Sequence, residues 1–295
     1  MALAAILDLQ VKRQKRKGRA MTDYRMIAVD MDGTLLKPDK TVHEESITDI
    51  QRVSDAGIPV VYCTGRALAE LQPYFAILPM MRYAVCYSGA IVYDCIEKRC
   101  VYRKEIGREY IELLVRTAKK YQAMAHFLTE EESIVSAEDI THMADFGMGV
   151  YQDLYEKVAR TVPDMEKEGE HHTSIPKINI YFRCPEERSR AYEELKDLPL
   201  TFACAEQTSL EINAANVTKA TGLQHLADFL QISLQQVAGI GDAENDREML
   251  SKVGFPIAMG NASDEIKSLC RYVTKDNEQN GVGEAIRYLM KESRL

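Results

Sequence analysis

The chain has 295 residues, of which 46% are hydrophobic and 28% are charged, and its formal net charge is −8. This composition is typical of a globular protein and excludes a disordered or fibrous chain. The length lies near the upper limit for one compact domain, so we expect two domains.

The first twenty residues differ from the rest in charge. They contain six basic residues and one acidic residue, a net charge of +5 that leaves −13 for the remainder of the total −8. Their short apolar stretch precedes the basic cluster, which is the reverse of a signal peptide, and it is too short to cross a bilayer. We interpret residues 1–20 as a non-native or disordered tail before a natural start at Met21. The alternative is a basic arm that docks on nucleic acid or acidic lipid.

The first expected strand ends in two aspartates. Ile27-Ala28-Val29 is apolar and leads into Asp30-Met31-Asp32-Gly33-Thr34. In an extended strand, alternate residues point to the same face, so Asp30 and Asp32 would stand about 7 Å apart on one side. Two carboxylates so close repel each other unless a cation or a shared proton compensates. A carboxylate nucleophile beside a carboxyl acid/base, with a hard metal alongside, would use both.

Helices and strands then alternate. Thr41-Val42-His43-Glu44 has the spacing of a capping box, and apolar residues follow it at helical period. We expect, in chain order, a helix over 42–56, a strand over 58–63, a helix over 67–76 and a strand over 83–87. The two strands end in Thr64-Gly65-Arg66 and Ser88-Gly89. This alternation predicts a parallel sheet with right-handed crossovers, buried on both faces.

A stretch of different character, 103–206, holds enough elements for a small α/β domain of its own. We expect there a helix over 108–122, a strand over 124–128, a polar segment over 163–172, a strand over 177–183, a helix over 186–197 and a strand over 200–204. We therefore divide the chain into a core of residues 21–103 and 206–295 and an insert of residues 104–205.

The pattern of the core returns after the insert. A strand over 237–241 ends in Asp242-Ala243-Glu244-Asn245-Asp246, followed by a helix to about 252, strands over 255–259 and 272–274, and a helix over 284–290. Open parallel sheets bind ligands at the carboxyl ends of their strands, so the polar strand ends should converge on one crevice. The predicted fold is α/β, with a Rossmann-like parallel-sheet core and an inserted smaller α/β domain.

Four features require one explanation: the Asp30/Asp32 pair, Thr64, Lys219 and the Gly241-Asp242-x-x-Asn245-Asp246 cluster. Hydrolysis of a phosphate monoester fits all of them. Enzymes accelerate this reaction by up to roughly 10²¹-fold, so several devices must act together. An aspartyl-phosphate would split the reaction in two, Mg²⁺ and a lysine would neutralise the phosphoryl oxygens, and a second aspartate would handle the proton of the leaving group.

With these motifs in this order, the chain resembles the haloacid dehalogenase-type (HAD) phosphatases of the Cof-type subfamily from about Met26 to Met290. The resemblance implies that Asp30 is the nucleophile and a Mg²⁺ ligand. It implies that Asp32 is the general acid/base, with its backbone carbonyl on the metal. Thr64 would hydrogen-bond the phosphoryl group, and Lys219 would neutralise it and orient Asp30.

The resemblance also implies roles for residues near these four. Asp242 would complete the protein ligands of Mg²⁺, with Asn245 and Asp246 close to the metal, and the insert would be a cap that closes over the site and selects the leaving group. The residues expected to contact substrate are Thr64, Gly65, Arg66, Ser88, Gly89, Lys219 and Asn245. Arg66 could bind the substrate phosphate or pair with a core acid. The chain departs from the family in having Ser88-Gly89 for Asn-Gly and Val217-Thr218-Lys219-Ala220 for Gly-Ser-Lys-Gly.

The leading hypothesis is therefore a Mg²⁺-dependent phosphatase that acts on a small phosphorylated metabolite, such as a sugar phosphate or a nucleotide cofactor. One alternative is a phosphomutase on the same core, and another is a catalytically idle relative with a binding or regulatory role. The acidic body argues against a nucleic-acid partner, and no membrane partner is expected. Seven cysteines without a C-x-x-C pair indicate reduced thiols, as in a cytoplasmic protein.

Overall fold

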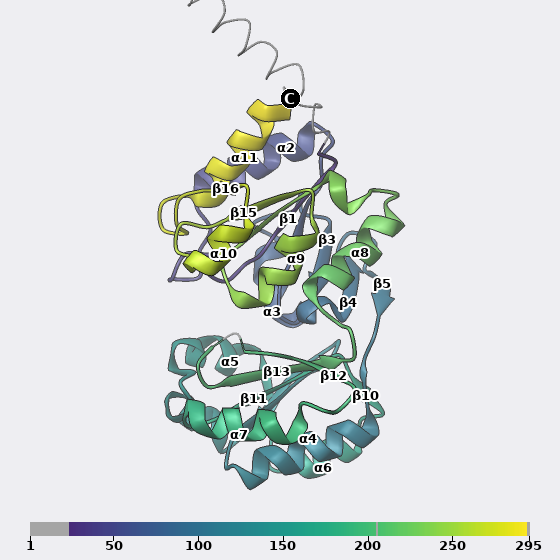
Figure 1. The fold of residues 1–295 in the computed structure, drawn as a ribbon. Helices are drawn as coiled ribbons and strands as arrows, with labels where there is room; N and C mark the ends of the chain where they lie inside the picture. Colours follow the sequence, from purple (N-terminus) through teal and green to yellow (C-terminus); the bar gives the residue numbers. More distant parts are fainter. Residues whose placement is uncertain (1–23, 205, 294–295) are drawn as a thin grey trace, which may run out of the picture.

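The computed structural model describes residues 24–204 and 206–293. The expectations for residues 1–20 and for a start at Met21 lie outside the described residues. A larger α/β unit carries both ends of the described chain, and a smaller α/β unit lies against it (Figure 1). No helix in the described part of the chain is long and apolar enough to span a membrane.

The larger unit, the core, is built on one eight-stranded sheet. In sheet order its strands are β16 (Tyr272–Val273), β15 (Phe255–Ala258), β14 (Val237–Gly241), β1 (Met26–Val29), β2 (Val60–Cys63), β3 (Tyr83–Cys86), β4 (Ile91–Asp94) and β5 (Arg99–Arg103). The pairs from β16 to β3 are parallel, whereas β3–β4 and β4–β5 are antiparallel. The central strands are apolar and fully buried because helices cover both faces of the sheet.

Two groups of helices cover the core sheet. On one face lie α2 (Glu44–Asp55), α3 (Leu68–Phe75) and α11 (Gly281–Ser293), and on the other lie α8 (Lys219–Phe229), α9 (Arg247–Lys252) and α10 (Asp264–Leu269). Short 3-10 helices are η1 (Tyr87–Gly89), η4 (Leu234–Gln236) and η5 (Glu244–Asp246). Each face has its own apolar cluster, so the sheet is the middle layer of three.

The smaller unit, the cap, has a six-stranded sheet. In sheet order its strands are β12 (Leu200–Ala203), β13 (Ser209–Ala214), β11 (Lys177–Tyr181), β7 (Met124–Leu128), β8 (Ser133–Ser136) and β9 (Ala159–Val162). Its outer face carries α4 (Arg108–Lys120), α6 (Met165–Glu170) and α7 (Pro185–Leu195). Its other face, turned toward the core in Figure 1, carries η2 (Asp139–Phe146), η3 (Gly149–Tyr151) and α5 (Gln152–Val158). A two-stranded ribbon of β6 (Ile106–Gly107) and β10 (Ser174–Ile175) lies beside it.

The predicted α/β class with an inserted domain is confirmed. The antiparallel hairpin β4–β5 was not predicted: β4 has a short apolar run that is mostly buried, but β5 is half-exposed or exposed and has no continuous apolar run. The cap sheet includes β13, beyond the boundary at residue 206 that the sequence suggested. We therefore propose that the insert extends from residue 104 to Ala214.

Two local predictions were wrong. Thr41 does not cap a helix: its hydroxyl bonds to Asp39, and α2 begins only at Glu44, after His43. Strand β1 ends at Val29, so Asp30 and Asp32 do not share a strand face as expected. Both lie on the chain segment that follows the strand, and their side chains take different partners.

Candidate active site

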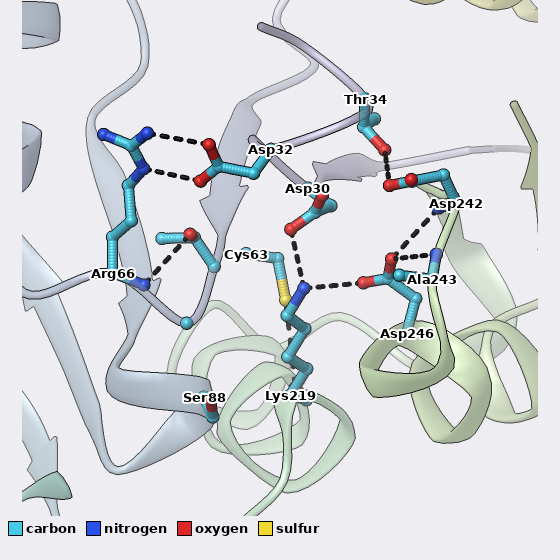
Figure 2. Close-up of polar contacts among 12 residues, drawn as sticks. Asp30, Asp32, Thr34, Cys63, Arg66, Ser88, Lys219, Asp242, Ala243 and Asp246 are labelled. Carbon is cyan, nitrogen blue, oxygen red and sulfur yellow. Dashed lines mark hydrogen bonds and ion pairs between the residues drawn. The ribbon is translucent and has the colours of Figure 1, made fainter. Parts of the chain in front are cut away.

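Three carboxylates lie together at the carboxyl ends of β1 and β14. Asp30 follows β1, Asp242 follows β14, and Asp246 ends the 3-10 helix η5; one oxygen of each lies within 4.8 Å of the others. The ammonium of Lys219, at the start of α8, donates to Oδ1 of Asp30 at 2.6 Å and to Oδ1 of Asp246 at 2.7 Å (Figure 2). The backbone N–H groups of Asp242 and Ala243 donate to Oδ2 of Asp246 at 3.0 and 3.2 Å.

The cluster has more negative than positive charge. With all groups ionised, three carboxylates and one ammonium leave two negative charges in a buried site. Burial raises the pKa of Asp30 well above its usual range, against the opposing charge of Lys219. Burial and the neighbouring carboxylate of Asp246 raise the pKa of Asp242 to about 6. A hard divalent cation bound here would reduce the repulsion among the carboxylates and lower the pKa of both Asp30 and Asp242. Several carboxylate oxygens close together are a typical ligand set for such a cation.

The turn after β1 is shaped to meet Asp242. Gly33 has φ +81°, and a Cβ there would lie 2.3 Å from Oδ2 of Asp242, so only glycine allows this approach. The hydroxyl of Thr34 donates to Oδ1 of Asp242 at 2.8 Å. The amide of Asn261 donates to Oδ2 of Asp242 at 3.2 Å and to the carbonyl of Gly33 at 2.9 Å. Asn261 was not predicted as a site residue; its position three residues after the end of the core strand β15 was the only sequence signal for it.

Asp32 is paired with two cations rather than with Asp30. Nε and Nη2 of Arg66 donate to its two carboxylate oxygens at 2.6 and 2.7 Å, and Nζ of Lys40 donates to Oδ1 at 2.8 Å. Burial alone would raise the pKa of Asp32, but the hydrogen bonds and charges of Arg66 and Lys40 outweigh it and lower the pKa to about 2. Of the two alternatives for Arg66, the structure has it pairing with a core acid. Its Nη1 is buried and has no hydrogen-bond partner among the described residues.

The segments after β2 and β3 lie side by side. Ser88 N–H donates to the Thr64 carbonyl at 3.0 Å, and the Thr64 hydroxyl accepts from the N–H of Arg66 at 3.1 Å. Tyr87, Ser88 and Gly89 have φ values of +51°, +56° and +104°. A Cβ on Gly89 would lie 2.0 Å from the carbonyl oxygen of Thr218, so this left-handed turn packs directly against the start of α8.

Side chains of the cap hold this turn of the core. Lys177 donates to the hydroxyl of Ser88 at 3.0 Å, and that hydroxyl donates to Glu211 at 3.2 Å. The amide of Asn213 donates to the carbonyl of Tyr87 at 2.9 Å. Lys177, Glu211 and Asn213 come from β11 and β13, so the cap fixes a backbone conformation that non-glycine residues rarely adopt.

A cavity of about 300 Å³ lies between core and cap. The predicted site residues that line it are Asp30, Asp32, Thr64, Gly65, Arg66, Asp242 and Asn245. Asn245 presents a buried Oδ1 with no hydrogen-bond partner in the part of the chain that is described. Lys219 and Asp246 lie behind Asp30, 1% and 0% exposed, and Ser88 and Gly89 are not part of the lining.

The cap wall of the cavity was not predicted. It includes Tyr151, Tyr155, Lys177, Asn179, Tyr181 and Glu211. These residues form no motif, but one signal was present: the predicted strand over 177–183 places Lys177, Asn179 and Tyr181 at alternate positions, which point to one face.

Comparisons with known proteins agree with this arrangement. A family model for haloacid dehalogenase-like hydrolases matches residues 27–286. The putative phosphatase YxeH of Bacillus subtilis is 27% identical over 276 residues, covering 90% of this chain and 98% of that protein. The 5-amino-6-(5-phospho-D-ribitylamino)uracil phosphatase YwtE of the same organism is 28% identical over 282 residues, covering 90% of this chain and 98% of that protein.

Solved structures share the fold. A haloacid dehalogenase-like hydrolase from B. subtilis superposes with a TM-score of 0.80 at 23% identity, covering 90% of this chain and 99% of that chain. The family resemblance predicted from the motifs is therefore confirmed over nearly the whole described chain: the chain belongs to the haloacid dehalogenase-like hydrolase family.

Proposed function

We propose that this protein is a Mg²⁺-dependent phosphatase that hydrolyses monoesters of small phosphorylated metabolites through an aspartyl-phosphate. The observation that carries the proposal is the buried group of Asp30, Asp242, Asp246 and Lys219, placed at the carboxyl ends of parallel strands and open to a cavity through Asp30 and Asp242. Curated relatives named as phosphatases support the same reaction class.

Asp30 is the proposed nucleophile. Lys219 engages its Oδ1, which leaves Oδ2 to attack phosphorus and form the aspartyl-phosphate. Carboxylate oxygens of Asp30 and Asp242 and the carbonyl of Asp32, with Asn245 and Asp246 close by, would hold Mg²⁺, which when bound supplies positive charge to the phosphoryl oxygens. Lys219 supplies a second positive charge to the same group.

Asp32 is the proposed general acid/base. It would donate a proton to the leaving-group oxygen and then take one from the water that hydrolyses the aspartyl-phosphate. Its pairing with Arg66 and Lys40 favours the ionised form, which suits the second step. A substrate phosphoryl group that drew Arg66 away would raise the pKa of Asp32 and so make the first proton transfer easier.

Contacts for the phosphoryl group are proposed at the two loops after β2 and β3. Thr64, Gly65 and Arg66 line the cavity, and the unpartnered Nη1 of Arg66 suits an anionic oxygen. Ser88 and Gly89 support these residues from behind through the turn that contacts α8. We expect the enzyme to act in the cytoplasm.

The test is phosphate release from a panel of phosphorylated metabolites and para-nitrophenyl phosphate, with Mg²⁺ and with EDTA. The wild-type protein should release phosphate only with the metal, and Asp30→Asn should abolish turnover because an amide is a poor nucleophile and a weaker ligand. Asp55→Asn, at the exposed end of α2, is the matched control. Isomerised product without free phosphate would identify a phosphomutase, and no reaction with any substrate would identify a catalytically idle relative.

A further inference from the structure

We propose that the cap half of the cavity selects leaving groups that donate hydrogen bonds and carry no negative charge. In this proposal Asn179 accepts the hydrogen bond from the leaving group. This inference rests on the proposed phosphatase function and concerns the part of the substrate that leaves.

Asn179 has an unused acceptor at the cavity. It lies in the middle of β11, is 5% exposed and lines the cavity. Its Nδ2 donates to the hydroxyl of Tyr181 at 2.9 Å, and the hydroxyls of Tyr181 and Tyr155 lie 3.2 Å apart. Its Oδ1 has no hydrogen-bond partner within the described ranges. Buried amide oxygens are nearly always paired, so a hydroxyl or N–H of a ligand is the group that would complete this one.

Among the described residues, the one lysine that the cap strands contribute to the cavity, Lys177, has all its donors occupied. An ammonium group has three donors, and those of Lys177 meet the carbonyl of Gly65 at 3.1 Å, Ser88 at 3.0 Å and Glu211 at 2.8 Å. Lys40 pairs with Asp32. The described part of the cap therefore offers no free positive charge to an anionic leaving group, and the cations on the core side, Lys40 and Arg66, lie on Asp32, where the phosphoryl group is proposed to bind.

A carboxylate reinforces this selection. Glu206 lines the cap half of the cavity, and the two lysines of the lining pair with other acids, Lys40 with Asp32 and Lys177 with Glu211. No ion pair among the described residues includes Glu206; the phenol of Tyr151 and the charge of Lys40, which lies beyond ion-pair distance, favour its ionised form. An acidic group on the leaving group would meet repulsion here, whereas an amine or hydroxyl would find an acceptor.

The size of the cavity limits the ligand further. A volume of about 300 Å³ is at the lower end for small-molecule sites, and the walls include Met148, Tyr151 and Leu154. The substrate class is thus the monophosphate of a single-ring or short open-chain compound that carries hydroxyl or amino groups and no second acid.

The test compares kcat/KM for glucose 6-phosphate, glucosamine 6-phosphate, 6-phosphogluconate and para-nitrophenyl phosphate. Wild type should prefer the first two over 6-phosphogluconate by at least about tenfold, as expected for one unfavourable charge contact. Asn179→Ala should lower the ratio of glucose 6-phosphate to para-nitrophenyl phosphate by at least about fivefold, because the nitrophenol offers no donor. Asn179→Asp should raise the ratio of glucosamine 6-phosphate to glucose 6-phosphate, because it adds a negative charge to an acceptor of the same shape.

Thr161→Ala, at an exposed position on β9, is the matched control and should change none of these ratios. Thermal melting confirms that each variant is folded. A wild-type preference for 6-phosphogluconate, or equal losses for all substrates in Asn179→Ala, would overturn the inference while leaving the phosphatase intact. Absence of hydrolysis of every substrate, para-nitrophenyl phosphate included, would instead overturn the proposed function.

Discussion

Lys219 is the only cation in contact with the carboxylate cluster among the residues described, and its removal gives the sharpest test of how that cluster is held. We consider Lys219→Met, which keeps the length of the side chain and deletes its charge. The ammonium is 1% exposed and touches two carboxylates at 2.6 and 2.7 Å. Removing one partner of a buried ion pair costs about 3–5 kcal/mol. The expected loss of Tm is roughly 6–20 °C for a chain of this size.

The loss should depend on pH and on Mg²⁺. Burial raises the pKa of Asp30 and Lys219 opposes that rise, so without the lysine the pKa rises further. The folded variant then holds a proton that the unfolded chain has lost, and its stability falls as pH rises above the usual aspartate range. The deficit should therefore be larger at pH 8 than at pH 5. Mg²⁺ binds only the folded protein, and 100 times its Kd would stabilise either protein by about 2.7 kcal/mol. At one fixed Mg²⁺ concentration the variant should gain more than wild type, because its cluster lacks the ammonium charge that repels the metal.

The assay is thermal unfolding at both pH values, with and without Mg²⁺. The matched control is Lys252→Met, which removes an exposed ion pair with Glu248 on α9 and should cost about 0–1 kcal/mol. If Lys219→Met is no more destabilising than Lys252→Met, or if Mg²⁺ stabilises it no more than wild type, the electrostatic account of the cluster is refuted.

Three further outcomes are expected. Asp32→Asn should slow hydrolysis of a sugar phosphate by at least tenfold more than hydrolysis of para-nitrophenyl phosphate, because the activated leaving group needs little protonation; equal loss in steady-state assays would contradict its acid/base role. Gly89→Ala should destabilise by several kcal/mol, because it combines positive φ with a clash against Thr218, whereas Gly57→Ala, with φ +86° in open space, should cost about 1 kcal/mol; equal shifts in urea midpoint would disprove the clash. Mg²⁺ affinity measured by calorimetry should rise between pH 5 and pH 7.5, because the pKa of Asp242 is about 6 and the ligand must lose its proton; a flat profile would rule this out.

The sequence located the polar strand ends well, for a physical reason. Parallel strands bring their carboxyl ends to one edge, so apolar runs followed by polar residues predict which side chains meet. Asp30, Asp242 and Asp246 do lie together, as their positions after β1 and β14 suggested. The roles assigned to them stay predictions.

The positions of strand ends do not predict which side chains pair with each other. Arg66 could contact either an acid or a phosphate, and only the three-dimensional path of the loops after β1 and β2 places it on Asp32. The cap residues that line the cavity could not be predicted from the sequence either. They are single residues at alternate positions of β11 and β13, and they form no compact motif. Long-range antiparallel register decides which of those residues face the cavity.

The left-handed turn at Tyr87, Ser88 and Gly89 limits which cap domains could be grafted onto this core. Its geometry belongs to the core, but Lys177, Glu211 and Asn213 of the cap hold it. A chimera that grafts another cap onto this core would leave the turn without those three partners, unless the incoming sheet offers the same groups at the same register. We therefore expect core and cap to be exchanged only as a matched pair. The contacts that match them join two cap strands, β11 and β13, to one turn of the core.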